Sequence, residues 1–137
     1  MAPADFEALN ESGEARNLGN RAEELALEHL RSAGLRLVAR NFRCRVGEID
    51  LVMQEGNCLV IVEVRCRQAG RQGRFPSAVE SIGPQKQRKL AKAALFFLAR
   101  HQRFQHHAVR FDVVAYDGPA PGSYALQWIR DAFRPGS

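Results

Sequence analysis

The amino-acid sequence predicts a small α/β domain, in which antiparallel strands and two helices form a sandwich. Apolar residues recur at helical spacing in residues 19–33 and 84–101, and strand-like apolar runs lie between and after these segments. A chain of 137 residues has the length of one domain with a buried core. We therefore expect residues 18–137 to form a single domain, preceded by a disordered polar segment over residues 1–17.

The first half of the domain is expected to contain one helix and three strands. The helix covers residues 19–33, because Gly34 can take the left-handed conformation that ends a helix. Three strand-like runs follow it: residues 36–46, 47–54 and 58–67. The sequence "QEGN" at residues 54–57 predicts a hairpin turn, with Gly56 and Asn57 available for positive φ.

The second half begins with the Gly- and Arg-rich loop "QAGRQGRFPS" at residues 68–77. Pro84 can occupy the first turn of a second helix that runs to about His101. A further strand is predicted at residues 108–116, which "GPAPG" ends. The last segment, "YALQWIRDAF", fits either a short strand or a terminal helix.

Composition excludes several classes of protein. With 45% hydrophobic and 26% charged residues, the chain is typical of a soluble globular domain. No apolar run approaches the roughly 18 residues of a membrane helix, and the amino terminus has no basic and apolar leader. Cys44, Cys58 and Cys66 match neither a zinc motif nor a disulfide framework. We expect a cytoplasmic protein without a membrane partner.

Positive charge is concentrated in one part of the chain. The formal net charge is +5, but between Arg65 and Arg110 eleven Lys or Arg residues accompany a single acid, Glu80. Such a block predicts a polyanionic partner, with nucleic acid, and DNA in particular, ahead of a membrane surface. The alternative is a basic face that serves only solvation.

Two predicted strands carry an acid between apolar residues. Because alternate strand residues share a face, Asp50 is expected to lie opposite the face of Ile49, Leu51 and Met53. If the turn at residues 54–57 pairs the two strands, Asp50 and Glu63 can meet on one face. A buried acid without a partner would cost several kcal/mol, so burial would require a cation or hydrogen bonds.

The first helix contributes a third acid. At about 100° per residue, Glu23 falls within the apolar arc formed by Ala22, Ala26 and Leu30, so we expect it to face the sheet. Its alternative role is a first-turn residue that the helix dipole favours. Three carboxylates on one face predict a site for a hard divalent cation, Mg²⁺ or Mn²⁺, which binds one or two carboxylates together with waters and a substrate phosphate.

Five segments resemble, in order, the uncharacterised bacterial YraN-like proteins. They are "GNRAEELALEHL", "NFRCRVGEIDLV", "VIVEVRCR", "KQRKLAKAALFFL" and "RFDVVAY", and the match runs from about Gly19 to Phe133. That family is similar to a branch of the restriction-endonuclease-like PD-(D/E)xK superfamily, close to archaeal Holliday-junction resolvases. The resemblance implies a mixed sheet of four or five strands flanked by helices. It also implies a metal-dependent endonuclease that hydrolyses DNA, with branched DNA among its substrates, and a homodimer.

The resemblance also implies roles for individual residues. Asp50 and Glu63 would bind the metal, and Glu23 would assist it. Lys86 or Gln87 would be the polar residue of the second helix near the site, and Arg65 and Lys86 would complete the catalytic group. The residues expected to contact nucleic acid are Arg67, Arg71, Arg74, Gln87, Arg88, Lys89 and Lys92. Independently, the phase of the second helix places Lys86 and Gln87 on its apolar arc at the first turn.

One position departs from the superfamily pattern. The third residue of its ExK motif is lysine, whereas this chain has Glu63, Val64 and Arg65. Arginine keeps the positive charge but stays protonated, so it cannot act as a base. Three hypotheses therefore remain after the sequence: an active endonuclease, a DNA-binding protein with a degenerate non-catalytic site, and an adaptor whose basic face binds a protein.

Overall fold

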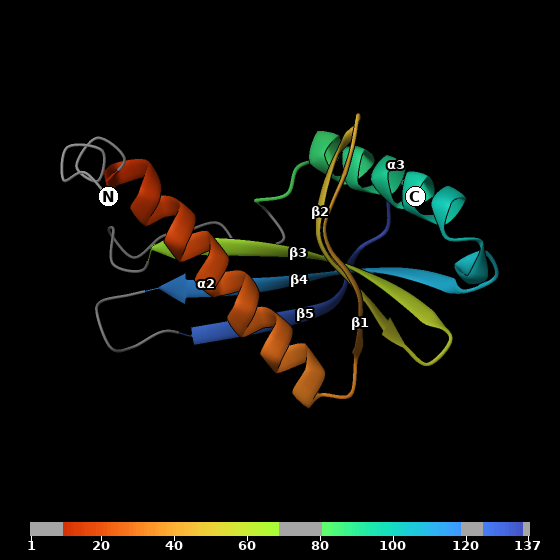
Figure 1. Cartoon of the computed structure of the whole chain (residues 1–137), viewed down its shortest axis with the longest axis horizontal. Helices are drawn as coiled ribbons and strands as arrows, with labels where there is room; N and C mark the ends of the chain where they lie inside the picture. Colours follow the sequence, from red (N-terminus) through yellow and green to blue (C-terminus); the bar gives the residue numbers. More distant parts are fainter. Residues whose placement is uncertain (1–9, 69–80, 119–124, 136–137) are drawn as a thin grey trace, which may run out of the picture.

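The computed structural model describes residues 10–68, 81–118 and 125–135. Its elements are α2 (Asn10–Ser32), β1 (Arg36–Cys44), β2 (Gly47–Glu55), β3 (Cys58–Gln68), α3 (Pro84–Arg100), the 3₁₀ helix η1 (Gln102–Phe104), β4 (Ala108–Gly118) and β5 (Ala125–Phe133). Figure 1 shows β3, β4 and β5 side by side, with β1 and β2 turning steeply across them. None of the helices in these residues is long and apolar enough to cross a membrane.

The five strands form one mixed sheet in the order β1-β2-β3-β4-β5. β3 and β4 are parallel, and the other neighbouring pairs are antiparallel. The parallel pair needs a crossover, which α3 supplies between β3 and β4. The predicted α/β class, and a mixed five-stranded sheet flanked by helices as in the restriction-endonuclease-like fold, are confirmed.

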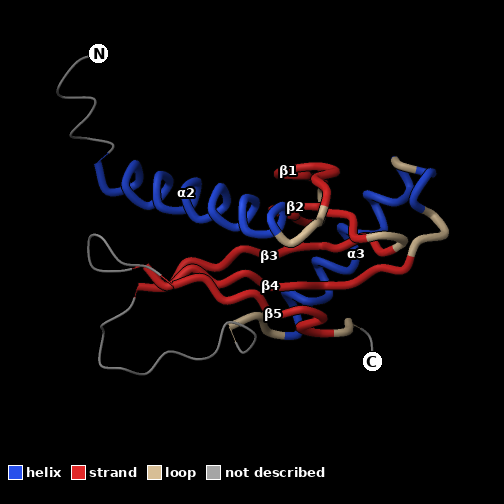
Figure 2. The backbone as a smooth tube through the Cα atoms, turned by 90° about the horizontal axis from the view of Figure 1, so that it is seen from below, coloured by secondary structure: helices blue, strands red, loops and turns tan. Residues whose placement is uncertain are grey.

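Two apolar clusters fix the helices to the sheet. One joins Leu27 and Leu30 of α2 to Val60 and Val62 of β3, among others. In the other, Leu90, Ala93, Ala94 and Phe97 of α3 pack against Leu59 and Ile61 of β3. Since successive residues of β3 belong to different clusters, α2 and α3 cover opposite faces of this strand. Figure 2 shows α2 running along one side of the sheet.

One predicted boundary is corrected, and one open alternative is resolved. The first helix begins at Asn10 rather than Gly19, so it includes residues 10–17. These residues contain no proline, and their glutamate, alanine and arginine favour a helix enough to tolerate a glycine. The remainder of the predicted disordered segment, residues 1–9, lies outside the described residues. The last segment, for which a short strand or a terminal helix was expected, is the strand β5 and pairs with β4.

The face assignment along β2 is wrong at one residue. Leu51 and Met53 pack in the α2 cluster, but Ile49 packs in the α3 cluster with Val52. The simple alternation therefore breaks between Ile49 and Leu51. The same place is where β2 stops pairing with β3, because their ladder runs only from Leu51↔Val62 to Glu55↔Cys58. Asp50 lies at this point of separation.

Candidate functional site

Asp50 and Glu63 come together where β2 leaves β3. Their strands pair up to Leu51↔Val62, so each acid is the next residue beyond the last pair. The side chain of Asp50 takes the place of the missing backbone partner: the N–H of Val64 donates a 2.8 Å hydrogen bond to Asp50 Oδ2. The carboxylate of Asp50 is thus held in the gap between the two strands.

Glu63 is the more deeply buried of the two acids, with 5% of its surface exposed. Two cations lie beside its carboxylate. Lys86 Nζ, from the first turn of α3, is 3.3 Å from Glu63 Oε2, and Arg65 Nε is 3.9 Å from the same oxygen. A buried carboxylate is tolerated when it is paired in this way. The packing of α3 against β3 therefore delivers Lys86 to the acid pair.

Burial raises the pKa of Asp50 to about 7, and the neighbouring carboxylate of Glu63 adds to this increase. The Val64 N–H and the Lys86 ammonium oppose the increase but do not cancel it. One of two adjacent carboxylates tends to keep its proton when too little positive charge lies nearby to compensate both. This donor pair fits a divalent cation that takes one or two protein carboxylates and completes its shell with water and phosphate.

Glu23 is near the pair but not part of it. Burial and the carboxylate of Asp50 both raise the pKa of Glu23, whereas Arg40 and Asn41 lower it. Its helix lies on the face of β3 opposite to α3. Within residues 10–68, 81–118 and 125–135, no group of three or more His, Cys, Asp or Glu side chains is arranged to hold a metal ion. The structure thus brings two of the three predicted acids together and leaves the third at longer range.

One N–H group of the Arg65 guanidinium has no hydrogen-bond acceptor in the described part of the protein. Its Nη2 donates to the carbonyl of Ser81 at 3.3 Å, but its Nε is buried and has no hydrogen-bond partner in the described part of the protein. A buried polar atom of this kind calls for an explanation, since most find a partner. A ligand oxygen beside Glu63 would satisfy it, and an anionic oxygen suits a guanidinium best.

The predicted nucleic-acid residues divide into three groups. Arg88, Lys89 and Lys92 are exposed on α3, as expected for a basic surface. Gln87 instead donates its Nε2 to the carbonyl of Ile82 at 3.0 Å and thereby stabilises the start of α3. The Arg67 side chain, Arg71 and Arg74 lie outside the described residues.

Arg45, which no sequence pattern singled out, extends this basic surface from the turn between β1 and β2. A Cβ at Gly47 would be 3.9 Å from Lys89 Cβ, so the turn lies against α3. The guanidinium of Arg45 is 5.5 Å from the centre of the Phe96 ring. Arg45 in "NFRCRVG" was the available signal, but only the fold shows that it is next to α3.

Arg110 does not belong to the basic surface, although it contributes to the positive charge of the segment from Arg65 onward. Its guanidinium donates two hydrogen bonds to Asp112, at 2.8 and 2.9 Å, and one to Glu55 at 2.8 Å. Asp112 is fully buried and also accepts hydrogen bonds from Trp128 Nε1 and the N–H of Asp131. This network stabilises β4 and β5, so Arg110 is a structural residue.

The raised pKa of Asp50 predicts a pH dependence of stability in the metal-free protein. A group whose pKa rises from 3.8 to about 7 on folding binds a proton more tightly in the folded state. Its contribution is complete below about pH 4 and is lost as the pH rises towards 7, with a slope of up to about 1.4 kcal/mol per pH unit. Urea unfolding in a chelator should therefore show wild type losing stability relative to Asp50→Asn over this range. A difference that is constant with pH would contradict the shared burial of the two acids.

Comparison with known proteins gives consistent matches over most of the chain. Residues 22–116 match the family model described as Uncharacterised protein family UPF0102. The chain is 51% identical to a UPF0102 protein of Alkalilimnicola ehrlichii over 115 residues, which is 84% of this chain and 85% of the relative. It is 49% identical to one from Stutzerimonas stutzeri over 120 residues (88% and 97%), and 46% identical to one from Nitrosococcus oceani over 119 residues (87% and 93%). The range matched by the family model contains the acid pair and both of its cations.

Proposed function

This chain belongs to uncharacterised protein family UPF0102, and from the geometry of its site we propose that it is a nucleic-acid-binding protein that hydrolyses DNA phosphodiesters with a bound divalent cation. The observation that supports this proposal is the contact of two buried carboxylates, Asp50 and Glu63, at the point where two strands separate. A buried acid pair in which one carboxyl, here Asp50, has a raised pKa is typical of a functional site.

Asp50 and Glu63 would hold the cation, Mg²⁺ or Mn²⁺, and Glu23 would add negative charge at longer range. When bound, such a cation polarises a phosphodiester and lowers the pKa of its bound water. The chain's own residues prepare the site for it. The Val64 N–H fixes the Asp50 carboxylate, and the packing around Glu63 limits the positions that its oxygens can take. Both acids are therefore pre-positioned, which reduces the reorganisation needed during the reaction.

Lys86 and Arg65 would act on the phosphate and the attacking water. The Arg65 Nε, buried and without an acceptor, is available to a non-bridging phosphate oxygen. Lys86 Nζ, 3.3 Å from Glu63, carries protons that can be transferred to or from a water beside the acid pair. Arg65 supplies only electrostatic stabilisation, since a guanidinium stays protonated.

The basic surface of Arg45, Arg88, Lys89 and Lys92 would hold the DNA backbone next to this site. We expect the double substitution Lys89→Gln with Lys92→Gln to lower the affinity for all DNA sequences alike. Each lost phosphate contact should reduce the slope of log affinity against log salt by about 0.9, so the pair should reduce it by up to about two. Fluorescence anisotropy with labelled duplexes over a series of salt concentrations measures both effects.

The matched control removes the same charge elsewhere. Arg31 at the end of α2 and Arg36 at the start of β1 are exposed and far along the chain from α3. Arg31→Gln with Arg36→Gln should change the salt slope little. Equal effects of the two double variants, or an affinity that does not depend on salt, would favour a general charge effect or a protein-binding adaptor over a DNA surface on α3.

Direct incubation with DNA tests the activity itself. Labelled duplex, single-stranded, flap and four-way DNA are each incubated with the full chain, with Mg²⁺, Mn²⁺ or chelator. Cleavage that requires the cation supports the proposal, and its preference among these forms identifies the substrate. Arg65 in place of lysine favours one other function, a DNA-binding protein with a non-catalytic site. Binding of these DNA forms without cleavage under any condition would select that alternative.

A further inference from the structure

The outer face of α3 carries an exposed leucine beside its cations. The buried residues of the helix face the sheet: Leu90, Ala93, Ala94 and Phe97. On the opposite side, Arg88, Lys92 and Leu95 follow one another at helical spacing, and all three are exposed. Leu95 has 65% of its surface exposed, and among the large apolar residues of the described part only Val109 is also exposed. The core of the domain therefore does not account for a leucine at this position.

Leu95 belongs to a continuous patch of four residues. Lys92 lies three residues before Leu95 and four before Phe96, and Ala99 lies four and three residues after them. Residues three and four apart are neighbours on a helix surface, so Leu95 and Phe96 share both of these neighbours. Lys92 and Ala99 are exposed, and Phe96 is half-buried. Lys92, Leu95, Phe96 and Ala99 thus form one surface, the Leu95 patch, which is apolar except for the cation at one end.

Phe96 connects this patch to the turn between β1 and β2. In the described part of the chain, Phe96 belongs to neither of the two apolar clusters that hold the helices on the sheet. The guanidinium of Arg45 is instead 5.5 Å from the centre of its ring. A guanidinium is planar, and nucleic-acid bases stack on such planes as well as on aromatic rings. Arg45 therefore adds a flat, positively charged group to the edge of the Leu95 patch.

The cations of α3 are not neutralised by acids of the same chain. The helix contains no Asp or Glu. Among the residues that the structure describes, Arg88, Lys89 and Lys92 have no acidic partner within ion-pair distance. Their charge is thus available to a polyanion.

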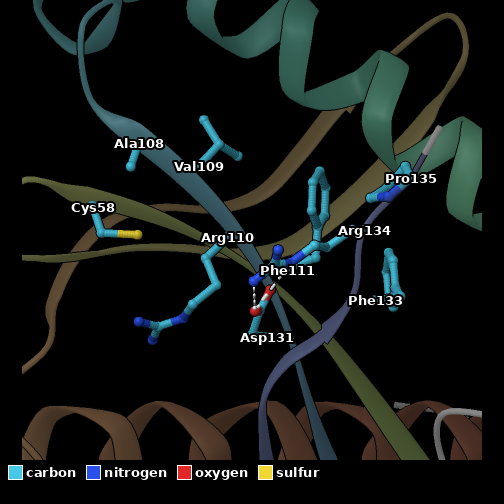
Figure 3. Close-up of a pocket in the computed structure, with 9 residues that line it drawn as sticks. All are labelled: Cys58, Ala108, Val109, Arg110, Phe111, Asp131, Phe133, Arg134 and Pro135. Atoms are coloured by element: carbon cyan, nitrogen blue, oxygen red, sulfur yellow. Dashed lines mark hydrogen bonds and ion pairs between the residues drawn. The ribbon is translucent and has the colours of Figure 1, made fainter. Parts of the chain in front are cut away.

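The cavity beside β4 and the end of β5 offers no comparable charge (Figure 3). Its volume is about 510 Å³, and Arg110 and Arg134 are among the residues that line it. Arg110 is bonded to Asp112 and Glu55, and Arg134 is bonded to Asp131. Charge complementarity therefore assigns a polyanionic ligand to the outer face of α3 and not to this cavity.

An apolar patch among cations fits the bases of a nucleic acid. The phosphates and sugars of the backbone are polar, whereas the two faces of each base are apolar. In a duplex these faces are stacked on neighbouring base pairs, but in a single strand they are free to contact a protein. Basic surfaces that follow the backbone, combined with side chains against which bases stack, are typical of proteins that bind single strands.

We propose that the Leu95 patch binds unpaired bases of a single-stranded DNA segment, while Arg88 and Lys89 contact its phosphates. This role rests on the proposed nucleic-acid binding and adds the class of DNA that the surface takes. Leu95 is nine residues after Lys86, which contacts the acid pair, and this spacing corresponds to about 14 Å along α3. At about 3.4 Å for each nucleotide of a strand, the unpaired bases lie roughly four nucleotides from a phosphate at the acid pair.

The test compares a strand that has bases with the same backbone without them. A labelled oligothymidylate and an abasic strand of equal length are each titrated with the full chain in chelator, and fluorescence anisotropy gives both affinities. We expect the oligothymidylate to bind at least about tenfold more tightly, the effect of one stacked base. Leu95→Ala should remove most of this difference by weakening the oligothymidylate alone. Arg88→Gln with Lys89→Gln should weaken both strands, because both carry the same phosphates.

Three controls separate contact with bases from other effects. Val109→Ala shortens the other exposed apolar residue, on β4, and should leave both affinities unchanged. Leu95→Met keeps an apolar side chain and should keep the preference for bases, whereas Leu95→Gln should lose it as Leu95→Ala does. The affinity for a paired duplex should not change in Leu95→Ala, because the faces of its bases are already stacked.

Several results would overturn the proposal. Equal affinity of wild type for the two strands would remove the contact with bases, and a salt-dependent affinity would still leave the DNA-binding function standing. An equal loss for both strands in Leu95→Ala would mean that Leu95 acts through the fold, and a loss for duplex would place it in a groove. Leu95-dependent sedimentation with anionic phospholipid vesicles, without a preference for bases, would assign the patch to a lipid surface. No binding to any DNA would overturn both this role and the proposed function.

Discussion

Asp50→Asn is expected to lower the rate of DNA cleavage by about 10³-fold or more. The substitution keeps the size of the side chain and can still accept the hydrogen bond from Val64, but it removes the charge that holds the cation. Loss of cation-based stabilisation of the transition state is worth several kcal/mol, which corresponds to a rate change of this size. Single-turnover cleavage in Mg²⁺, with each variant saturated by substrate, measures the change.

DNA binding provides the internal control for this variant. Asp50→Asn removes a negative charge that repels the phosphate backbone, so affinity measured in chelator should be unchanged or higher. Glu28→Gln, at an exposed position of α2, removes one acid away from the site and should leave cleavage intact. Cleavage by Asp50→Asn at the wild-type rate would rule out the acid pair as the catalytic centre, and a parallel loss of binding would point to misfolding.

The proximity of Asp50 and Glu63 could be predicted from the sequence, because the two features that bring them together are both local. Strand alternation placed Asp50 and Glu63 on defined faces, and the hairpin turn at residues 54–57 set the register that puts them opposite each other. The hairpin has only two residues between Glu55 and Cys58, and of its two residues only Gly56 has a positive φ, at 58°. A positive φ was expected to be available to both Gly56 and Asn57, but Asn57 does not adopt one.

Other features depend on contacts that no local pattern encodes. The helical phase placed Glu23 towards the sheet, but it could not show that α2 and α3 lie on opposite faces of β3. β2 separates from β3 before Leu51, and this separation depends on the twist of the sheet and on both strands that neighbour β2, β1 and β3. For this reason Ile49 was assigned to the wrong face. Arg45 became part of the basic surface only through the position of α3.

The extension of the first helix and the register of β4 with β5 show the same limit. Residues 10–17 are polar, and polarity alone does not separate an exposed helix from a disordered segment. The ladder between β4 and β5 has an irregular register between Phe111 and Val113 and ends at Phe111↔Phe133. Registers between strands distant in sequence are set by the packed core, which the sequence of either strand does not contain.

Lys86→Arg is expected to lower the cleavage rate by about 10²- to 10⁴-fold, the range of general acid–base catalysis. Lys86 Nζ is 3.3 Å from Glu63 Oε2, so it provides the amine that Arg65 cannot provide in the motif itself. Arginine at position 86 would keep the charge but would stay protonated, so it could not take up a proton as a base. Adding Arg65→Lys to this variant exchanges the two side chains while keeping the net charge, and it should restore most of the lost rate.

The single variant Arg65→Lys separates this interpretation from the simpler one. If Lys86 already supplies the amine, Arg65→Lys should change the rate in Mg²⁺ only slightly. A large increase in rate, by itself, would mean instead that arginine limits catalysis and that Lys86 has another role, such as neutralising Glu63. Should wild type and all of these variants bind every DNA form without cutting any in Mg²⁺ or Mn²⁺, the same acid pair and basic surface would describe a DNA-binding protein whose nuclease site is inactive.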